Sequence, residues 1–536
     1  MIVAGAISGI QEYLFDVADE GGGQARRLRA RSFFIQLLAE AASLRAMSAL
    51  GWSRAGVRSL LSGAGKFVLS GPIVDQASQK LRVAEQAMSR WLLQQLRGEL
   101  RLSLGWSEMG DEVIAYSEAM GMLQKAKSRG WSSVAITANG WDPSALVLPP
   151  LDQPCSLCAH QTAEYDEYDQ ETSQTKRVCR RCTQDRALGQ MLPRARWLTI
   201  SDSPDQDELD LFGLGAALSS DETVPLTRRT VTVTNLVRPD VILVGCPPDI
   251  FLPRQLMSYI PVQNQQPIMF VDLARKARGD CLLGVLKADA DSLGLKINRL
   301  LQHATSLQPV ASLSGRLDRF FTGRLKQELE AGANQRFRLI YTVFAGGDDL
   351  LLVGPWDVML DFAGRVNELF QAEFSDLGLS ISGGLAIMKP KRPIKHAVAE
   401  ASRLLDEAKQ VIVHGEVSAK DQLAAFGEIW KWKHHAAILQ SAMRLADWVA
   451  NRDAERGWLH TWLKLTEASR AAQPDSIAIS RLAAHIARNC RRGSAIREWA
   501  ESLVEDFDDT HRVETRYLPG ILRYALTATR TPTQEE

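Results

Sequence analysis

The stretch of the sequence that most clearly suggests catalysis or metal binding contains two adjacent aspartates. Residues 341–356 read YTVFAGGDDLLLVGPW, with β-forming residues on both sides of Gly346, Gly347, Asp348 and Asp349. Neighbouring carboxylates repel each other unless a cation lies close to both. The pattern therefore predicts a β-hairpin whose turn carries a cation-binding pair of aspartates. A surface turn that is acidic without any chemistry is the alternative interpretation.

Two more aspartates end the run LKADADSLG, residues 286–294. If this buried strand lies beside the hairpin, Asp289 can face Asp348 and Asp349. Hard oxygen ligands select Mg²⁺ or Mn²⁺. Two such ions can hold the attacking and leaving oxygens of a phosphoryl transfer. We therefore expect these three aspartates to bind two metal ions and to be catalytic.

Other residues near these motifs could contact a nucleotide. Gly346 and Gly347 would let the backbone approach a triphosphate, and the turn after Asp291 offers N–H groups at the start of a helix. Lys409, late in a predicted helix, could reach phosphate oxygens, and Ser382 could contact a base. A solvated lysine and a serine that merely fits a tight strand are the alternatives.

The apolar spacing of residues 281–410 predicts the elements that hold these groups. Strands are expected where aliphatic residues run together, and helices where apolar residues recur every three or four positions. The expected order is strand 281–288, helix to about 330, strands 336–344 and 350–354, helix 362–377, strand 379–387 and a helix after Pro393. This β-α-β-β-α-β-α order is that of a split βαβ, ferredoxin-like domain.

The same motifs occur a second time, near the start of the chain. SGAGKFVLSGP (62–72) matches AGGDDLLLVGP (345–355) at an offset of 346 − 63 = 283 residues. At that offset Ala6 falls on Asp289, and ELRLSL (99–104) falls on residues 382–387. A register shared by three elements predicts an internal duplication. A chance match between short glycine-rich turns is the alternative.

The two copies differ at the residues that could bind cations. The first copy has Ala6, Gly65 and Lys66 where the second has its three metal-binding aspartates. Only the second copy is therefore expected to be catalytic, and the first is a degenerate copy.

Four of the seven cysteines form two pairs, Cys155-x₂-Cys158 and Cys179-x₂-Cys182, separated by 20 residues. This spacing predicts a zinc ribbon with four thiolate ligands. Because four protein ligands complete the coordination of Zn²⁺, we expect a structural role.

The bulk composition excludes some classes of protein. The chain has 536 residues, 45% hydrophobic and 24% charged, with 63 basic and 63 acidic residues. The net charge gives no argument for or against nucleic acid, and no apolar run reaches the length of a membrane helix. We predict an α+β protein with two ferredoxin-like domains, a zinc-binding inserted domain and a helical C-terminal domain. The expected bounds are 1–130, 131–265, 266–415 and 416–536.

These motifs, in this order, resemble the large polymerase/cyclase subunit of type III CRISPR–Cas effector complexes, the "Cas ten" family of Csm and Cmr complexes. The resemblance is carried by GAISGIQEYLF, LRARSFFIQLL, GAGKFVLSGP, the cysteine pairs, LKADADSLG, FAGGDDLLLVG and LSISGGLAI. It covers roughly residues 1–415. It implies two palm domains related to nucleotide cyclases, a zinc-bearing domain between them and a helical C-terminal domain that docks on partner subunits.

The resemblance also implies a function in antiviral defence. Once its complex binds target RNA, the enzyme would make cyclic oligoadenylates from ATP with Mg²⁺ or Mn²⁺. A 3′-hydroxyl of an acceptor on the degenerate palm would attack the α-phosphate of a donor on the catalytic palm. The implied partners are the other effector subunits, the CRISPR RNA and the target RNA, in the cytoplasm and without a membrane.

Two departures from the family pattern are visible. Many members begin with an HD nuclease domain, whereas here the first palm begins at residue 1, so no HD-type DNase is expected. The family often has Tyr-Ser before GGDD, where this chain has Phe344 and Ala345. The loss of the serine hydroxyl leaves nucleotide choice and product size open.

Three other functions stay open at this point. The subunit could make a different product, such as a linear nucleotide or an AMP conjugate, or it could be a non-catalytic scaffold. Clustered aspartates weigh against a scaffold. A free-standing diguanylate cyclase would pair two identical active palms, whereas this chain has one active and one degenerate copy.

Overall fold

The computed structural model describes residues 1–15, 24–63, 65–137, 140–169, 174–237, 249–252, 259–263, 266–413, 415–471, 473, 475–507 and 512–531. The chain forms two compact units. Unit 1 comprises Met1–Tyr259, Leu293–Glu328 and Thr342–Asp349, and unit 2 comprises Ile260–Ser292, Leu329–Tyr341 and Leu350–Glu536. The four domains expected from the sequence, with boundaries near residues 130, 265 and 415, are not tested by this division into two units and stay predictions.

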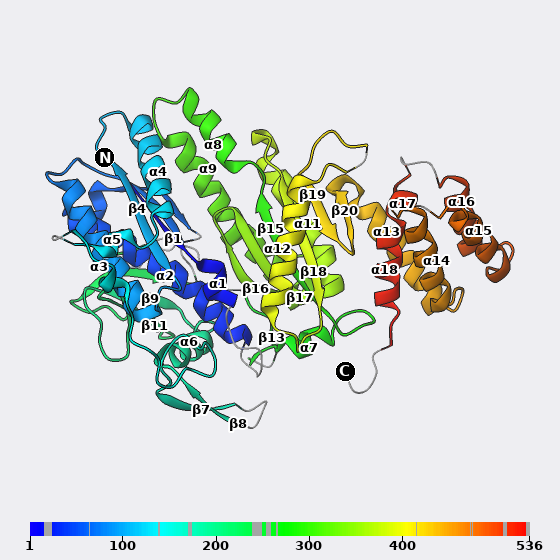
Figure 1. Cartoon of the computed structure of the whole chain (residues 1–536), viewed down its shortest axis with the longest axis horizontal. Helices are drawn as coiled ribbons and strands as arrows, with labels where there is room; N and C mark the ends of the chain where they lie inside the picture. Colours follow the sequence, from blue (N-terminus) through cyan, green and yellow to red (C-terminus); the bar gives the residue numbers. More distant parts are fainter. Residues whose placement is uncertain are drawn as a thin grey trace. The chain divides into compact units, whose positions relative to one another are not determined.

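The first sheet lies in unit 1, where Figure 1 labels β1 and β4, and it has the strand order of a ferredoxin-like domain. It consists of β1 (Ile2–Ser8), β2 (Arg58–Gly63), β3 (Lys66–Ser70) and β4 (Arg101–Ser107), in the order β2-β3-β1-β4. Alternate residues of a strand face opposite sides. Ile2, Ala4 and Ala6 accordingly share one face, where they pack with α4 (Glu112–Ser128), α8 (Leu293–Gln302) and α9 (Gln308–Asp318).

Helices and short strands surround this sheet. The remaining elements of this region are α1 (Ile10–Phe15), α2 (Gln24–Leu50), η1 (Arg54–Gly56), α3 (Ala77–Leu96), α5 (Ser132–Ala135), β5 (Ile136–Thr137), β6 (Gly140–Trp141) and η2 (Pro143–Leu146). Within the described residues, only Arg26–Leu50 of α2 is long and apolar enough to cross a membrane by composition, and 78% of its most apolar window is buried inside the protein. That burial is typical of a core helix.

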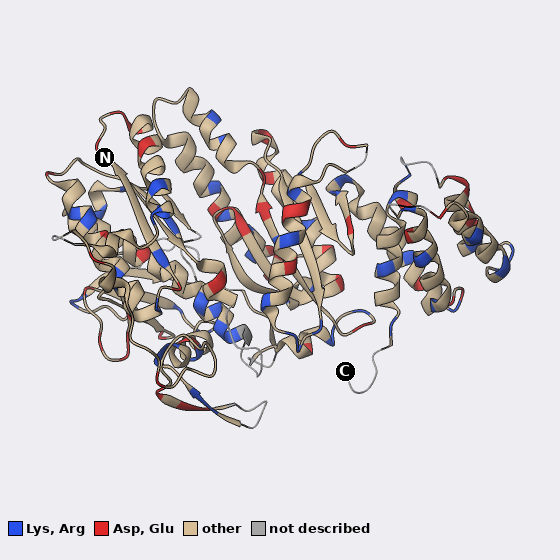
Figure 2. Cartoon of the chain, in the orientation of Figure 1, with Lys and Arg blue, Asp and Glu red and all other residues tan. Residues whose placement is uncertain are grey.

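The middle of the chain adds a hairpin, a helix and a second small sheet to unit 1. Its elements are β7 (Tyr165–Asp169), β8 (Gln174–Val178), α6 (Arg180–Met191), β9 (Trp197–Ser201), β10 (Leu209–Leu211), β11 (Leu214–Ser219) and β12 (Thr230–Asn235). The small sheet has the order β10-β11-β9-β12. Acidic residues of β7 lie opposite basic residues of β8, with Glu167 across from Lys176 and Asp166 across from Arg177 (Figure 2). Such cross-strand pairs of opposite charge stabilise a hairpin.

The second large sheet repeats the order of the first and then extends it. Its strands are β15 (Leu283–Ala290), β16 (Tyr341–Gly346), β17 (Asp349–Pro355), β18 (Ile381–Met388), β19 (Gln422–Ala425) and β20 (Glu428–Lys431), in the order β16-β17-β15-β18-β19-β20. The associated elements are β13 (Val262–Gln263), β14 (Gln266–Pro267), α7 (Phe270–Ala274), η3 (Arg319–Arg324), α10 (Leu325–Ala331), η4 (Gln335–Leu339), α11 (Trp356–Phe374), η5 (Ser375–Leu377) and α12 (Ile394–Gln410). The first four strands confirm the ferredoxin-like order, and the protein is α+β.

The register of the two sheets supports the duplication and corrects part of its alignment. Ala6 pairs with Ser103 in the first sheet, and Asp289 pairs with Ser382 in the second. The offset in this strand is therefore 382 − 103 = 279, and the offset of 283 expected for residues 99–104 is wrong. The connection that precedes the last strand differs in length between the copies, which sequence matching of a short strand does not reveal.

The helix that follows the last strand packs in the same way in both copies. A Cβ added at Gly105 of β4 would lie 2.3 Å from the backbone N of Leu123 in α4. A Cβ added at Gly384 of β18 would lie 2.4 Å from the backbone N of Leu405 in α12. Both distances are shorter than any real Cβ contact, so only glycine permits this close approach of helix to sheet.

The C-terminal part begins with a hairpin, not with a helix. We expected helical structure from about residue 416, but β19 and β20 occupy residues 422–431, and β19 pairs in parallel with β18. Phe426 and Gly427 have φ values of 52° and 73°, which form a tight two-residue turn. The helices follow: α13 (Trp432–Ala450), α14 (Arg456–Ser469), α15 (Ala478–Asn489), α16 (Ala495–Glu505), α17 (Val513–Arg516) and α18 (Leu518–Ala528).

Candidate active site

Asp289 lies near the end of β15 and is paired with a lysine of unit 2. Lys409, in the last turn of α12, forms an ion pair with the Asp289 carboxylate, and each side chain is 24% exposed. Burial, together with the positive charges of Lys420 and Lys287, lowers the pKa of Lys409 to about 8. The structure therefore brings together two of the residues that the sequence predicted for this site.

Asp291 and Ser382 also lie together, but their side chains are hydrogen-bonded to each other. Ser382 donates a hydrogen bond of 2.9 Å to Asp291, and Ser380 donates one of 2.8 Å. The backbone N–H of Asp421 donates a third, of 3.0 Å. Ser382 is fully buried and Asp291 is 4% exposed. In this geometry the pair positions the end of β15, and their predicted contact with a nucleotide stays a prediction.

The segment that completes this cluster carries no recognisable motif and was not predicted. Lys420 donates a hydrogen bond of 2.6 Å to Ser292, next to Asp291. Gln422 donates hydrogen bonds of 2.6 and 2.7 Å to Ala408 and Val411, so it satisfies free carbonyls at the C-terminal end of α12. These contacts hold the turn that carries Lys409.

The two adjacent aspartates lie at the turn between β16 and β17. Gly346 ends β16, Asp349 begins β17, and Gly347 has a φ of 70°, a left-handed conformation that favours glycine. In the order of the sheet, β17 is the neighbour of β15, the strand that carries Asp289. These donors are carboxylate oxygens, the ligand type that suits Mg²⁺ or Mn²⁺.

The turn also meets the first copy of the palm within unit 1. A Cβ added at Gly63, the last residue of β2, would lie 3.4 Å from the backbone N of Gly347 and 3.9 Å from a carboxylate oxygen of Asp318. The hairpin of the degenerate palm therefore reaches the GGDD turn.

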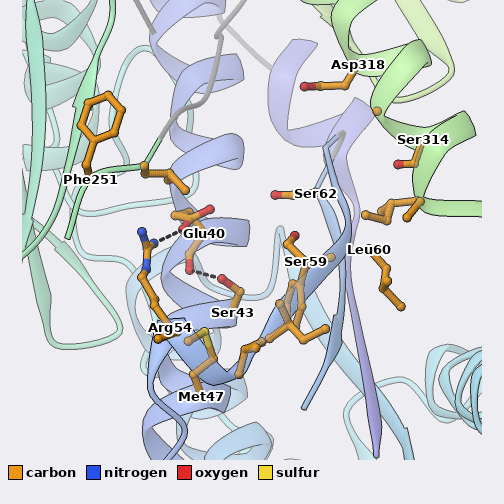
Figure 3. Close-up of a pocket in the computed structure, with 18 of the residues that line it drawn as sticks. Glu40, Ser43, Met47, Arg54, Ser59, Leu60, Ser62, Phe251, Ser314 and Asp318 are labelled. Atoms are coloured by element: carbon orange, nitrogen blue, oxygen red, sulfur yellow. Dashed lines mark hydrogen bonds and ion pairs between the residues drawn. The ribbon is translucent and has the colours of Figure 1, made fainter. Parts of the chain in front are cut away.

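A pocket of about 700 Å³ in unit 1 is lined in part by residues of the β2–β3 hairpin (Figure 3). Its charged lining residues are Glu40, Arg54, Asp249 and Asp318, and Arg54 is paired with Glu40 at 3.1 Å. Figure 3 shows Ser62, Ser314 and Asp318 extending toward the side of the pocket that holds Glu40 and Phe251. Because carboxylates outnumber the one arginine, this pocket is a poor site for a phosphate group.

The cysteine cluster has the geometry of a closed metal site. The four sulfurs lie within 4.8 Å of one another and all four residues are buried. Cys155 Sγ is 3.8 Å from Cys182 Sγ, and Cys158 Sγ is 3.8 Å from Cys179 Sγ. Four sulfurs about 2.3 Å from one zinc ion in a tetrahedron lie about 3.8 Å apart. The donor set therefore fits Zn²⁺.

Hydrogen bonds to sulfur favour a thiolate in this cluster. The backbone N–H groups of Leu157 and Cys179 donate to Cys155 Sγ at 3.4 and 3.2 Å. Contacts among the four thiols, Cys158 first, hold the pKa of Cys155 well below its usual range and raise the pKa of Cys179 and Cys182, so a thiolate forms first at Cys155. A cysteine that ionises readily is a good metal ligand.

Buried ion pairs connect the cysteine cluster to the first palm. Asp185 of α6 is fully buried and contacts Arg31 of α2 at 3.2 Å and Arg181 at 2.7 Å. The guanidinium of Arg181 also lies 3.4 Å from the centre of the Phe34 ring. These contacts fix α6, which carries Cys182, against α2.

The two sheets and the retained acidic strand end define a protein with paired palm domains of the nucleotidyltransferase type. Residues 282–424 match the family model "Cas10/Cmr2, second palm domain", and residues 1–135 match "Csm1 subunit domain B". The chain belongs to the Cas10/Csm1 family, the large subunits of type III-A CRISPR complexes.

Two curated relatives agree with this assignment. The chain is 24% identical over 469 residues to a protein of Thermococcus onnurineus (strain NA1), covering 82% of this chain and 58% of the relative. It is 24% identical over 477 residues to one of Mycobacterium tuberculosis (strain ATCC 25618 / H37Rv), covering 84% and 57%. Both are named CRISPR system single-strand-specific deoxyribonuclease Cas10/Csm1 (subtype III-A). The chain thus spans less than two thirds of their length.

Solved structures share the fold over nearly the whole chain. A Csm1-Csm4 cassette in complex with one ATP has a TM-score of 0.73 at 18% identity, covering 99% of this chain and 70% of that chain. A cassette in complex with cA4 has a TM-score of 0.71 at 18% identity, with the same coverage. At this identity the likeness establishes the fold.

Proposed function

We propose that this chain is the nucleotidyltransferase of an RNA-guided type III-A complex and makes cyclic oligoadenylates from ATP. The observation that carries the proposal is the asymmetry of the two palms. The second palm keeps Asp289, paired with Lys409, at the position where the first palm has Ala6. A buried strand end that keeps an acid–lysine pair in one copy alone points to a task that only this copy performs. The family, and fold relatives described as complexes with ATP and with cA4, support the same task.

In this proposal Asp289, Asp348 and Asp349 hold two divalent ions. The ions, when bound, neutralise charge on the attacking and leaving oxygens. The acceptor's 3′-oxygen forms a bond to the donor's α-phosphorus, the bond from that phosphorus to the β-phosphate oxygen breaks, and pyrophosphate leaves. The hydroxyl proton passes to solvent. Lys409 is positioned to exchange the Asp289 carboxylate for a phosphate oxygen of the donor.

The remaining assignments follow from the same family. We propose that Cys155, Cys158, Cys179 and Cys182 hold a structural zinc ion. We also propose that the chain assembles with other effector subunits, since fold relatives are Csm1-Csm4 subcomplexes, and that it acts with a CRISPR RNA and a target RNA. The relatives are named as deoxyribonucleases, but the acidic palm site supports nucleotide synthesis.

A product assay tests this function. The chain, assembled with its guide-bearing partners, receives radiolabelled ATP, Mg²⁺ or Mn²⁺ and matched target RNA, and the products are separated by chromatography. The Asp348→Ala/Asp349→Ala double variant removes the turn carboxylates, and Asp406→Ala, on the exposed side of α12, is the control. We expect RNA-dependent products from the unaltered chain and from the control, and none from the double variant.

The products also separate the alternatives. Their mass distinguishes cyclic oligoadenylate from a linear nucleotide or an AMP conjugate. If no product forms with any variant although RNA is bound, the ATP assignment is wrong and a scaffold or another nucleotide substrate takes its place.

A further inference from the structure

The sheet of the first palm ends at a strand to which the second palm adds another. β4 is the last strand of its sheet, and among the described strands none pairs with its outer side. In the second sheet, β19 pairs in parallel with β18 at Gly383 and Gly384. The offset of 279 between β4 and β18 places Leu104 at the position of Gly383 (383 − 104 = 279). The same edge is therefore covered by a strand in one copy only.

The hydrogen-bonding groups of this edge point away from β1. In an antiparallel pair, the N–H and C=O groups of alternate residues point toward the partner strand and away from it. The N–H of Leu104 points outward, because it donates a hydrogen bond of 2.7 Å to a carboxylate oxygen of Glu85 in α3. Leu102 and Trp106 share this direction. The Glu85 carboxylate thus takes the place of one carbonyl of a neighbouring strand.

A cavity of about 450 Å³ lies along this edge, within unit 1. It is lined by β4, by α3 and α4, and by residues that follow α4. Three of its lining residues are apolar and exposed: Val83 by 62%, Met122 by 36% and Ile136 by 58%. Exposed apolar residues that gather at one hollow are typical of an interaction site.

The side of the cavity toward α3 is apolar. Trp106 faces α3, because its indole N–H donates a hydrogen bond of 2.8 Å to Ser78 of that helix. Leu102 and Leu104 share this face, since alternate residues of a strand project to the same side. Gly105, of the opposite set, lies against α4. A strand added here would direct every second side chain to the apolar side.

The side of the cavity toward α4 is basic. Lys125 and Arg129 line it at the C-terminal end of α4, and both are exposed. Arg82 of α3 adds a third positive charge. Glu85, already bonded to β4, is the one acidic residue among the described residues of the lining. A segment that presents carboxylates to α4 complements these charges.

We propose that β4 takes up one short strand of a partner protein, parallel to β4, in which apolar and acidic residues alternate. Its apolar side chains pack on the α3 side, and its carboxylates pair with Lys125 and Arg129. In this mode of recognition, main-chain hydrogen bonds to a sheet edge supply affinity and alternate side chains supply selectivity. The orientation follows β19, which covers the matching edge of the second palm. The inference rests on the proposed assembly with other subunits and is independent of the proposed catalysis.

Charge reversal tests the basic side of the cavity. The labelled full chain is titrated with the guide-bearing assembly of the other subunits, and fluorescence anisotropy gives the dissociation constant. Lys125→Glu/Arg129→Glu should weaken binding at least about tenfold, because like charges then face each other across the interface. Arg90→Glu/Arg228→Glu, at exposed positions outside the cavity, changes the net charge equally and should bind like the unaltered chain.

Hydrogen exchange tests the added strand itself, and it uses the unaltered chain. In the assembled complex the amides of Leu102 and Trp106 should exchange at least about tenfold more slowly than in the chain alone, because new main-chain hydrogen bonds protect them. The amides of Ser103 and Gly105 point toward β1 and serve as the internal reference. Mass spectrometry with fragmentation that resolves single amides measures these rates.

A photo-crosslink identifies the occupant of the cavity. A photoreactive benzophenone amino acid placed at Val83 lies at the rim of the cavity in the assembled complex. Mass spectrometry of the crosslinked peptides should find a segment of one partner subunit in which apolar and acidic residues alternate. A crosslink to RNA, to a second copy of this chain or to a segment without acidic residues would overturn the proposal.

The other two measurements can also overturn it. The proposal is wrong if the charge reversal binds as tightly as its control, or if Leu102 and Trp106 exchange equally fast in the chain and in the complex. Nucleotide synthesis is read separately. A complex that protects β4 but makes no product would contradict the proposed catalysis and support the strand site. A complex that makes product with β4 unprotected would contradict the strand site alone.

Discussion

Asp361 shows how one partly buried carboxyl makes stability depend on pH. It lies one turn after Asp357 on α11, and Asp357 is paired with Arg336 at 2.7 Å. The pKa of Asp361 is raised from 3.8 to about 6, mainly by burial and also by the charge of Asp357, while Arg336 opposes the increase. The folded protein therefore binds a proton at Asp361 more tightly than the unfolded chain does.

Asp361→Asn should stabilise the protein at pH 8 and have little effect near pH 4. The stability that comes from the raised pKa is present below the unfolded value and is lost as pH rises through about 6. A shift of about two pKa units corresponds to at most about 3 kcal/mol. Urea unfolding of both proteins across this pH range measures the difference, with exposed Asp406→Asn as the control. A benefit that does not grow with pH would contradict the prediction.

Local spacing in the sequence was enough to identify those site residues that belong to short motifs. Asp289 and the four cysteines each belong to a pattern within a few residues, and the structure places the cysteine sulfurs together. The hydrogen bond from Asp421 to Asp291 joins residues 130 positions apart. No local pattern encodes such a contact, since it depends on how β19 meets β18.

The cysteine-bearing region shows how small elements depend on one another. Cys179 caps α6, and its sulfur accepts a hydrogen bond of 3.4 Å from the backbone of Cys182 in the first turn. The same helix carries Asp185, which contacts Arg31 of α2. A metal ion that joins the two cysteine pairs would therefore also hold α6 in place against the first palm.

Cys182→Ser should lower the zinc content from one ion per chain to less than half and should lower the melting temperature. The energy of binding a structural zinc ion is also energy of folding, so residues 150–190 should become sensitive to protease. Zinc is measured by atomic absorption after dialysis. Cys281→Ser, a cysteine outside the cluster, should keep zinc and resist protease like the unaltered chain. Full zinc content in Cys182→Ser would exclude this metal site.

The prediction of secondary structure was wrong where the geometry of a turn outweighed the apolar spacing. The apolar spacing of FGEIWKWKHH predicts the start of a helix. The turn at Phe426 and Gly427 instead reverses the chain, and Leu423 of β19 is fully buried. The parallel contact of β19 with β18 then decides the structure, a tertiary effect that propensity does not contain. Strands β15 and β17 were predictable because each carries a run of aliphatic residues, whereas residues 336–339, expected to begin a strand, form η4.

The duplication shapes the molecule as a whole, because one chain supplies two palms that have diverged in charge. Within unit 1 the hairpin of the first palm reaches the GGDD turn of the second, at Gly63 and Gly347. A free-standing cyclase needs two chains to bring two palms together. Here one chain carries both hairpins, so a single substitution can test the contact between them.

Gly63→Leu should reduce nucleotide synthesis, while Gly63→Ala should leave it nearly unchanged. A Cβ at residue 63 would lie 3.4 Å from the backbone N of Gly347, which is tolerable, but a leucine side chain would extend into the turn and displace Asp348 and Asp349. Misplacing catalytic groups by about 1 Å costs on the order of a hundredfold in rate. Gly110→Leu, where the added side chain meets open space, is the control. RNA-dependent turnover of labelled ATP measures the effect, and a melting curve shows whether the fold is kept. If Gly63→Leu turns over ATP as fast as the control, the hairpin of the first palm takes no part in shaping the catalytic turn.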